Sequence, residues 1–189
     1  MTDSNDGPPE VLATEEIYRG RIFDVAVDTV REGARTYTRE VVRHNGGAAA
    51  VACFDDGTVA LVRQYRHPAG RYVLELPAGK LEEGEPPAVC AARELEEEVG
   101  AVPGRMELLS EFFTTPGFCG EKIWVFLATE LTETAPTHEE DELIEVVRLP
   151  VGRAVEMIGS REIEDAKTVI GLLLAARRIG ARAGGAAEP

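Results

Sequence analysis

Glu94, Glu97 and Glu98 follow one another at spacings of three and four residues, which places side chains on one face of an α-helix. Like charges at these spacings destabilise a helix by about 0.2–0.5 kcal/mol per pair. One interpretation is an acidic surface face in contact with water. The other is a cluster of carboxylate oxygens, which are the ligands that Mg²⁺ and Mn²⁺ prefer.

The residues before this helix favour the metal site. Gly79 ends a strand-like run, ELPAG, so the backbone can turn sharply there and expose carbonyl oxygens. A short acidic loop, KLEEGE, then leads into the helix. Arg93 lies close enough to hold one carboxylate in place through a bidentate hydrogen bond. Carboxylates beside a turned backbone would form an oxygen-rich cage for a hard cation.

The segment GKLEEGEPPAVCAARELEEEVGA, residues 79–101, resembles the Nudix box, G-x5-E-x7-R-E-U-x-E-E-x-G-U, in which U is aliphatic. The fixed positions of the box are occupied by Gly79, Glu85, Arg93, Glu94, Leu95, Glu97, Glu98 and Gly100. Ala101 departs from the pattern, since Ile, Leu or Val is usual there, but this position only packs. The resemblance implies a metal-dependent hydrolase of phosphate anhydrides and makes a solvated face the weaker interpretation.

The resemblance also implies a role for each residue of the box. Glu94 and Glu98 would be the principal metal ligands, and Glu97 and the carbonyl of Ala78 would be further ligands. Glu97 and Arg93 would take part in catalysis. Glu85, Arg93 and Gly79 would orient the site. The cofactor would be two or three Mg²⁺ ions, with Mn²⁺ as the alternative.

Three segments outside the box resemble the ADP-ribose pyrophosphatase branch of the family. They are RQYRHPAGRYVLELPAG (63–79), TTPGFCGEKIWVFLA (114–128) and SREIEDAKTVIGLLLA (160–175). With the N-terminal strands, the resemblance extends from about Glu16 to Ile179. It implies hydrolysis of ADP-ribose to AMP and ribose 5-phosphate.

Candidate substrate-binding residues come from these segments and from the N-terminal strands. Arg66 could bind the diphosphate through its forked guanidinium, or be a surface arginine at the end of a strand. Arg43 is a weaker candidate for the adenosine end. Glu75 either hydrogen-bonds substrate or faces solvent. Pro116 and Gly117 form a turn, and the resemblance implies that this turn shapes the substrate pocket.

The loop THEEDE, residues 137–142, holds a second acidic cluster. Charge runs in loops are usually solvated, but in this branch a glutamate of the equivalent loop reaches the metals or activates water. Glu142 is in the best-matched position and Glu140 is the alternative, because insertions shift the register. Either one would accept the proton of the attacking water.

The elements that must position these residues can be predicted from periodicity and turn signals. Pro86 can open the acidic helix and Gly100 can close it, with Ala88, Ala92, Leu95 and Val99 on its apolar stripe. Asp55-Asp56-Gly57 predicts a hairpin between Ala48–Phe54 and Thr58–Tyr65. Further strands are predicted at 71–76, 106–113, 122–129 and 143–149, and further helices at 151–158 and 164–179.

This order of elements favours an α+β fold. The resemblance implies the Nudix fold, an α/β/α sandwich with a mixed, largely antiparallel sheet, preceded by a small N-terminal antiparallel β-sheet. We expect a disordered N-terminus at 1–10, a β-sheet subdomain for dimerisation at 11–45, the hydrolase domain at 46–180 and a flexible tail at 181–189.

The N-terminal strands, between Glu16 and Arg43 with a turn at Glu32-Gly33, would have exposed edges and little core of their own. We therefore expect a partner to cover them. The resemblance points to a homodimer whose substrate pocket takes residues from both chains.

The composition limits the other partners and the compartment. The 189-residue chain has a formal net charge of -14, which repels nucleic acids and anionic membranes. It would also repel an anionic substrate unless metal ions or arginines reverse the field locally. Cys53, Cys90 and Cys119 form no CxxC pair, and the polar N-terminal residues do not resemble a signal peptide. We expect a cytoplasmic protein.

Other functions remain open from the sequence. Within the enzyme class, the substrate could be a nucleotide sugar such as GDP-mannose, a dinucleotide such as NADH or FAD, or a damaged nucleotide. A regulator that senses ADP-ribose without cleaving it would be expected to have a degraded box. A structural calcium module is excluded because the glutamates are helical and no EF-hand pattern occurs.

Overall fold

The computed structural model describes residues 7–137 and 143–185. The chain forms two compact units, one of Met1–Gly46 with Phe113–Lys122, and one of Gly47–Phe112 with Ile123–Pro189. The sequence predicted a boundary close to residue 46. It did not predict that Phe113–Lys122 belongs with the N-terminal strands. The two units are described separately below.

The first unit contains a three-stranded antiparallel sheet, which the sequence predicted. Strands β1 (Glu10–Arg19), β2 (Asp24–Glu32) and β3 (Arg35–Arg43) pair in chain order. A tight turn joins β2 to β3, and Gly33 adopts the left-handed conformation that such a turn needs. Strand β1 begins at Glu10 and is exposed along its whole length. This sheet therefore leaves apolar side chains of β1 in solvent.

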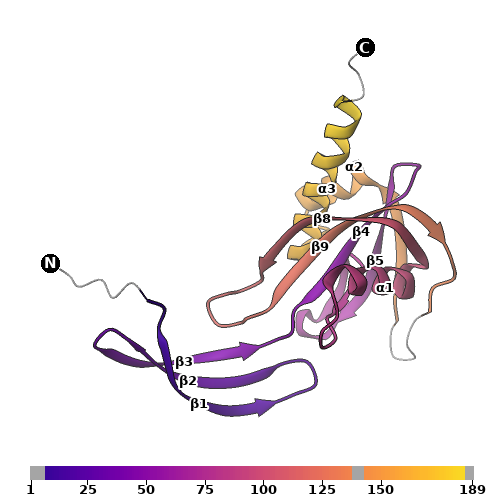
Figure 1. Cartoon of the computed structure of the whole chain (residues 1–189). Helices are drawn as coiled ribbons and strands as arrows, with labels where there is room; N and C mark the ends of the chain where they lie inside the picture. The colour runs from indigo at the N-terminus through magenta and orange to yellow at the C-terminus, as the bar shows by residue number, and fades with distance from the viewer. Residues whose placement is uncertain (1–6, 138–142, 186–189) are drawn as a thin grey trace. The chain divides into compact units, whose positions relative to one another are not determined.

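The second unit is built on a larger, mixed sheet (Figure 1). Its strands are β4 (Gly47–Cys53), β5 (Thr58–Arg66), β6 (Arg71–Glu75), β7 (Ala78–Lys80), β8 (Ala101–Phe113), β9 (Lys122–Glu133) and β10 (Glu145–Pro150). The order is β10-β5-β4-β9-β8, with β6 paired to β5 and β7 paired to β4. The β4–β9 pair is parallel, while the pairs of β5 with β4, β6 and β10 are antiparallel.

Strand β4 shows why helices lie on both faces of this sheet. Its small apolar residues are all buried except for partly exposed Cys53, as expected for a strand covered on both sides. Ala48, Ala50 and Ala52 pack with helix α1 (Pro87–Val99), whereas Ala49 and Val51 pack in a second core with helices α2 (Val151–Gly159) and α3 (Ala166–Gly185). Alternate residues of one strand thus serve two cores, which gives the predicted α/β/α sandwich.

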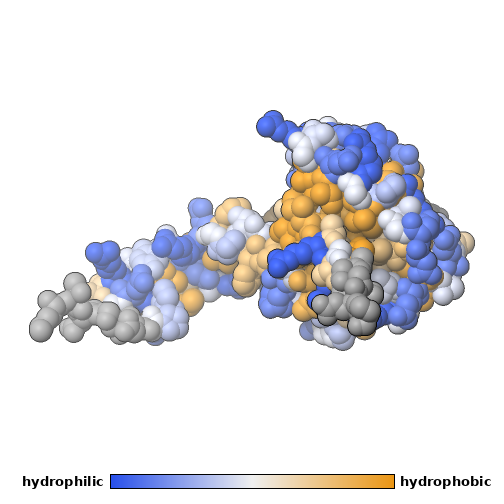
Figure 2. Space-filling model, turned by 90° about the horizontal axis from the view of Figure 1, so that it is seen from above, coloured by the Kyte–Doolittle hydropathy of each residue, from blue (hydrophilic) through white to orange (hydrophobic). Residues whose placement is uncertain are grey.

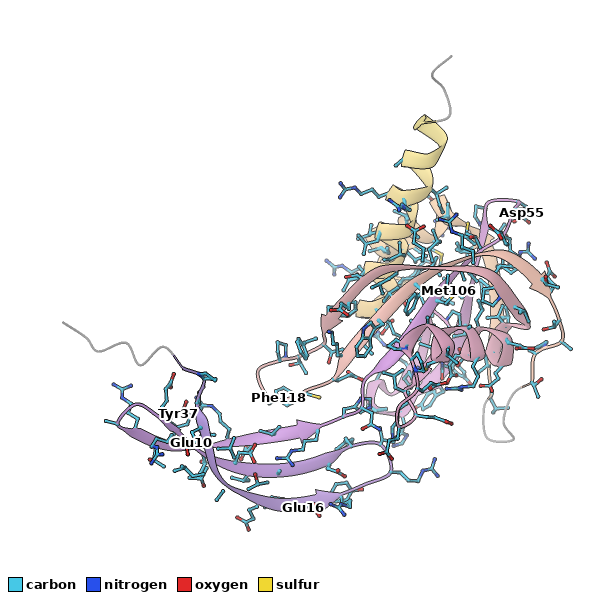
Figure 3. All side chains as sticks on the ribbon, in the orientation of Figure 1. Glu10, Glu16, Tyr37, Asp55, Met106 and Phe118 are labelled. Carbon is cyan, nitrogen blue, oxygen red and sulfur yellow. The ribbon has the colours of Figure 1, made fainter. Side chains whose placement is uncertain are left out.

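Most predicted elements are confirmed, with shifts at their ends. The Asp55-Asp56-Gly57 turn joins β4 and β5, and Asp55 marks its tip in Figure 3. Helix α1 starts after Pro86 and ends at Gly100, which caps it in the left-handed conformation. Strand β8 starts five residues before the expected Met106, and α3 ends at Gly185, beyond the expected Ile179. Residues 181–185 therefore continue this helix.

The region around α1 differs from the prediction in two respects. The sequence did not predict the short strand β7, because three residues around a glycine give no periodic signal. The predicted apolar stripe is confirmed for Leu95, which is buried, and for Ala88 and Val99, which pack against the same core. Cys90 and Ala91 are buried as well, whereas Ala92 is only partly buried. Packing against the sheet, rather than hydrophobic periodicity alone, sets this face.

Among the described residues, no helix is long and apolar enough to cross a membrane. Figure 2 shows the second unit from the side on which α3 ends, with hydrophobic surface between hydrophilic regions.

Candidate active site

The position of β7 brings a backbone turn next to the acidic helix. Strand β4 pairs with β7 through Gly47, Ala48 and Ala49, and with β5 only further along, through Ala52 and Cys53. The two partners thus share one edge of β4. Helix α1 contacts both β4 and β7. The Ala78–Gly79 backbone is therefore fixed beside the face of α1 that carries the carboxylates.

Gly79 is required there because a side chain would occupy the place of a carboxylate. A Cβ atom built on Gly79 would overlap the carboxylate of Glu94. Gly79 does not have positive φ, so the reason for glycine is space and not backbone conformation. Glu94 consequently lies directly against the backbone that supplies the candidate carbonyl ligand.

Glu98 is held at the same strand. Its side chain is only 4% exposed, and its Oε2 atom accepts a hydrogen bond from the N–H of Ala78 at 3.0 Å. A buried carboxylate needs such partners, since desolvation of its charge is unfavourable. Ala78, Glu94 and Glu98, which the resemblance implies as metal ligands, thus lie next to one another.

Arg93 lies at the centre of the acidic face. Its Nε atom donates to Glu85 at 3.1 Å, and its Nη1 atom donates to Glu94 at 2.7 Å and to Glu97 at 3.0 Å. The hydrogen bonds to Glu85, foremost, and to Glu94 raise the pKa of Arg93. The bond to Arg93 lowers the pKa of Glu85, which also accepts the N–H of Glu82. Arg93 and Glu85 therefore fix the loop and the carboxylates together.

The donor set has the chemistry of a divalent-cation site. Glu94, Glu97 and Glu98 supply only oxygen atoms, which suits Mg²⁺ or Mn²⁺. In the described part of the chain, no three His, Cys, Asp or Glu side chains converge closely enough to hold a metal ion. Arg93 bridges Glu94 and Glu97 and so compensates their negative charge. The donor atoms therefore suit the ion by their chemistry, and Arg93 lies between Glu94 and Glu97 as their counter-charge.

Cys90, one turn before Glu94, does not add thiolate chemistry. Burial raises the pKa of its thiol to about 12, so it stays protonated at neutral pH. It packs in the core on the α1 side of the sheet.

Arg66 and Glu75 form a bidentate ion pair. Nε of Arg66 donates to Oε1 of Glu75 at 2.7 Å, and Nη2 donates to Oε2 at 2.8 Å. Glu75 is 2% exposed, which rules out the interpretation that it faces solvent. The hydrogen bond to Glu75 raises the pKa of Arg66, and the charge of Glu98 adds to this effect. The pair therefore lies within electrostatic reach of the acidic face.

The sequence analysis overlooked the residues of α3 that complete this pair. Lys167 forms ion pairs with Glu75 and, at 3.1 Å, with Asp165. Thr168 donates its hydroxyl to Asp165 at 2.6 Å and accepts the N–H of Leu76 at 2.8 Å. The signal that could have found Lys167 is its place in the first turn of a helix, where a cation is disfavoured by the helix dipole.

Arg43, Pro116 and Gly117 belong to the first unit. Arg43 donates to Asp28 at 3.1 Å, and Asp28 also accepts the hydroxyl of Thr14. The 114–121 loop, with Phe118 marked in Figure 3, bonds to the edge of β3 through Val42. Pro116 and Gly117 line a hollow of about 440 Å³, together with Arg39, Glu40, Val41, Phe113, Phe118, Cys119 and Gly120. Glu140 and Glu142, the candidate bases, lie outside the described residues.

Comparison with known proteins gives a consistent picture. The family model described as NUDIX domain matches residues 44–169. The chain is 40% identical over 162 residues to "ADP-ribose pyrophosphatase" of Bacillus subtilis (strain 168), covering 84% of this chain and 88% of that protein. It is 41% identical over 164 residues to "Methanol dehydrogenase activator" of Bacillus methanolicus, covering 85% and 89%.

A further relative is "ADP-ribose pyrophosphatase" of Mycobacterium tuberculosis (strain ATCC 25618 / H37Rv), 40% identical over 168 residues, with 87% of this chain and 81% of that protein covered. Among solved structures, one described as "Crystal structure of ADP compounds hydrolase" superposes with a TM-score of 0.81. It covers 93% of this chain and 96% of that chain at 23% identity, which supports the fold.

Proposed function

The chain belongs to the Nudix family of hydrolases, and on this basis we propose that it hydrolyses the diphosphate bond of ADP-ribose to AMP and ribose 5-phosphate. The observation that carries the chemistry is the set of glutamates on α1 beside the Ala78–Gly79 backbone. The choice of substrate is supported by the relatives named ADP-ribose pyrophosphatase, which match most of the chain.

In this proposal, Glu94, Glu97 and Glu98 with the carbonyl of Ala78 hold two or three Mg²⁺ ions, with Mn²⁺ as the alternative. Bound there, the ions would supply Lewis acidity and lower the pKa of the attacking water. They would also offset the repulsion between an acidic protein and an anionic substrate.

Other residues bind, orient and move protons. Arg93, which holds Glu85, Glu94 and Glu97 in the structure, fixes the orientation of the ligand carboxylates. Glu142, or Glu140 in the alternative register, accepts the proton of the attacking water.

Further residues are proposed to bind the substrate. Arg66 binds the diphosphate, and Glu75 acts on the substrate through Arg66, because both of its oxygens are already engaged. Arg43 serves the adenosine end, and Pro116 and Gly117 shape the pocket. We also propose a homodimer and a cytoplasmic location.

A product analysis tests the proposed function directly. The purified protein is incubated with ADP-ribose and Mg²⁺, and the products are separated and identified. AMP and ribose 5-phosphate in equal amounts are expected, and chelation of the metal should stop the reaction. GDP-mannose, NADH and FAD are assayed in parallel at the same concentration. A higher kcat/KM for any of these would contradict the assignment of ADP-ribose.

A further inference from the structure

Lys167 occupies an unfavourable place for a cation. It lies in the first turn of α3, where the positive end of the helix dipole repels it, and its side chain is only 14% exposed. Burial of an ammonium group is also unfavourable unless anions surround it. Both carboxylates that contact it, Glu75 and Asp165, belong to one connected network. Lys167 therefore stays at this position despite repulsion by the helix dipole and the cost of burial, which points to a specific role.

Anchoring of α3 is not that role, because neighbouring residues already provide it. Asp165 directly precedes α3, and its Oδ2 atom accepts the N–H of Thr168 at 3.0 Å, as an N-cap does. The hydroxyl of Thr168 accepts the N–H of Leu76, directly after β6, and so ties the same turn to this segment. Lys167 adds no further bond to the sheet backbone, and its distinctive contact is with Glu75.

The charges around Glu75 suggest what this contact does. Arg66 alone would form a neutral pair with Glu75, and its attraction for an anion would be largely cancelled. Lys167 binds the Oε2 atom that Arg66 also uses, so two cations share Glu75. Lys167 also pairs with Asp165, which gives the network two charges of each sign. Within the described residues, Nη1 of Arg66 has no acceptor, and the side chain of Arg66 is 41% exposed. Glu75 therefore holds the guanidinium of Arg66 through Nε and Nη2, and leaves Nη1 available to an anion.

We propose that Lys167 is a positioning residue for substrate binding. It neutralises Glu75, so that Glu75 can fix the guanidinium of Arg66 without cancelling its attraction for the diphosphate of the substrate. Lys167 acts through Arg66 and does not touch the substrate. This inference depends on the proposed function, since it needs an anionic ligand at Arg66.

The test compares steady-state kinetics of ADP-ribose hydrolysis with Mg²⁺ in matched variants. Lys167→Met removes the charge and keeps the length of the side chain. It should raise KM about tenfold while kcat changes less than about twofold, because the attraction of Arg66 for the diphosphate weakens equally in the ground state and in the transition state. Lys167→Arg keeps the charge and should return KM to within about threefold of wild type. Arg153→Met, which removes an equally positive but exposed side chain on α2, should leave KM unchanged.

A double variant keeps the test decisive if Lys167→Met folds poorly. Glu75→Gln combined with Lys167→Met removes one charge of each sign and restores the original charge balance around Arg66. Its KM should be lower than that of Lys167→Met, a non-additive result that a purely structural lysine would not give. Thermal unfolding of each variant separates loss of fold from loss of binding.

Several outcomes would overturn the inference. They are a wild-type KM in folded Lys167→Met, a fall in kcat without a rise in KM, no rescue by arginine, or a double variant as impaired as the single one. Failure of the wild-type protein to cleave ADP-ribose would instead reject the proposed function. The same variants would then be measured with whichever diphosphate the protein does cleave.

Discussion

At the scale of single residues, Arg93 compensates the negative charge of the acidic face of α1. It donates to three glutamates, and Glu98 is instead satisfied by the backbone N–H of Ala78. Repulsion between the glutamates, which would otherwise weaken the helix, is thereby reduced. Variants that remove one charge should accordingly fold, and their defects should appear in turnover.

Glu98→Gln should lower kcat for ADP-ribose by at least about a hundredfold, because a neutral amide is a poor ligand for Mg²⁺. The amide oxygen can still accept the N–H of Ala78, so the thermal midpoint should change little. Glu96→Gln on the exposed side of the same helix is the control and should keep wild-type kcat. Near wild-type turnover in Glu98→Gln would contradict the metal assignment.

Gly79→Ala should displace Glu94, since the new Cβ would overlap its carboxylate. We expect a loss of about 1–3 kcal/mol in the free energy of unfolding and at least a tenfold fall in kcat. Gly152→Ala, at an open position of α2, should leave kcat unchanged and should not lower the free energy of unfolding. Urea denaturation and steady-state assays measure the two effects. An equal effect of both substitutions would show that lack of space for a side chain is not the reason for glycine at position 79.

The ion pairs of Glu75 should make stability depend on pH. Burial favours its neutral form, but the hydrogen bond from Arg66 and the charge of Lys167 outweigh this, so its pKa is lowered from 4.5. The folded state then binds fewer protons than the unfolded chain. The stabilisation is present above pH 4.5 and is lost as pH falls through the lowered pKa. Glu75→Gln should therefore be less stable than wild type at pH 7.

Urea denaturation of both proteins at several pH values between 7 and about 3 provides the measurement. The difference in unfolding free energy should shrink as pH falls below 4.5. A difference that is constant over this range would mean that the pKa of Glu75 is the same in the folded and unfolded states.

At the scale of elements, the sequence predicted those with strong local signals. The β4–β5 hairpin has Asp55-Asp56-Gly57, and α1 has Pro86 and Gly100 at its ends. The Nudix box also contains the three glutamates that Arg93 contacts, Glu85, Glu94 and Glu97. Strand β7 and the Glu75–Lys167 pair depend on tertiary contacts, and the latter joins residues 92 positions apart. Local spacing carries no information about such pairs, which explains why the sequence analysis overlooked Lys167.

Helix α3 offers a matched pair of glycines that tests how closely it packs on the sheet. A Cβ on Gly171 would lie 2.6 Å from Leu76, 3.0 Å from Val125 and 3.2 Å from Val51. Gly171→Ala should therefore destabilise the protein by about 1–3 kcal/mol. Gly180 in the same helix has open space around it, so Gly180→Ala should stabilise by up to about 1 kcal/mol. Thermal and urea unfolding measure the change in the free energy of unfolding for each variant. Stabilisation by Gly171→Ala would contradict the close packing of α3 on the sheet.

At the scale of the whole molecule, the first unit differs in kind from the second. The second unit has helices on both faces of its sheet and two continuous cores. The first has a three-stranded sheet whose strand β1 exposes Val11, Ile17 and Tyr18 by more than half. Small sheets are marginal by themselves, and exposed apolar strands mark interaction surfaces. The sequence predicted this sheet, together with a partner that covers its exposed strand.

We predict that a second copy of the chain covers β1, so light scattering should give twice the 20.4 kDa mass of one chain. Ile17→Glu places a charge on the exposed face of β1 and should shift the mass to that of one chain. Leu173→Glu, at a similarly exposed position of α3, should remain dimeric. If the pocket takes residues from both copies, Ile17→Glu should also lose activity at low protein concentration and regain part of it at high concentration. A wild-type protein with the mass of one chain would reject the dimer, and the apolar residues of β1 would then need another partner.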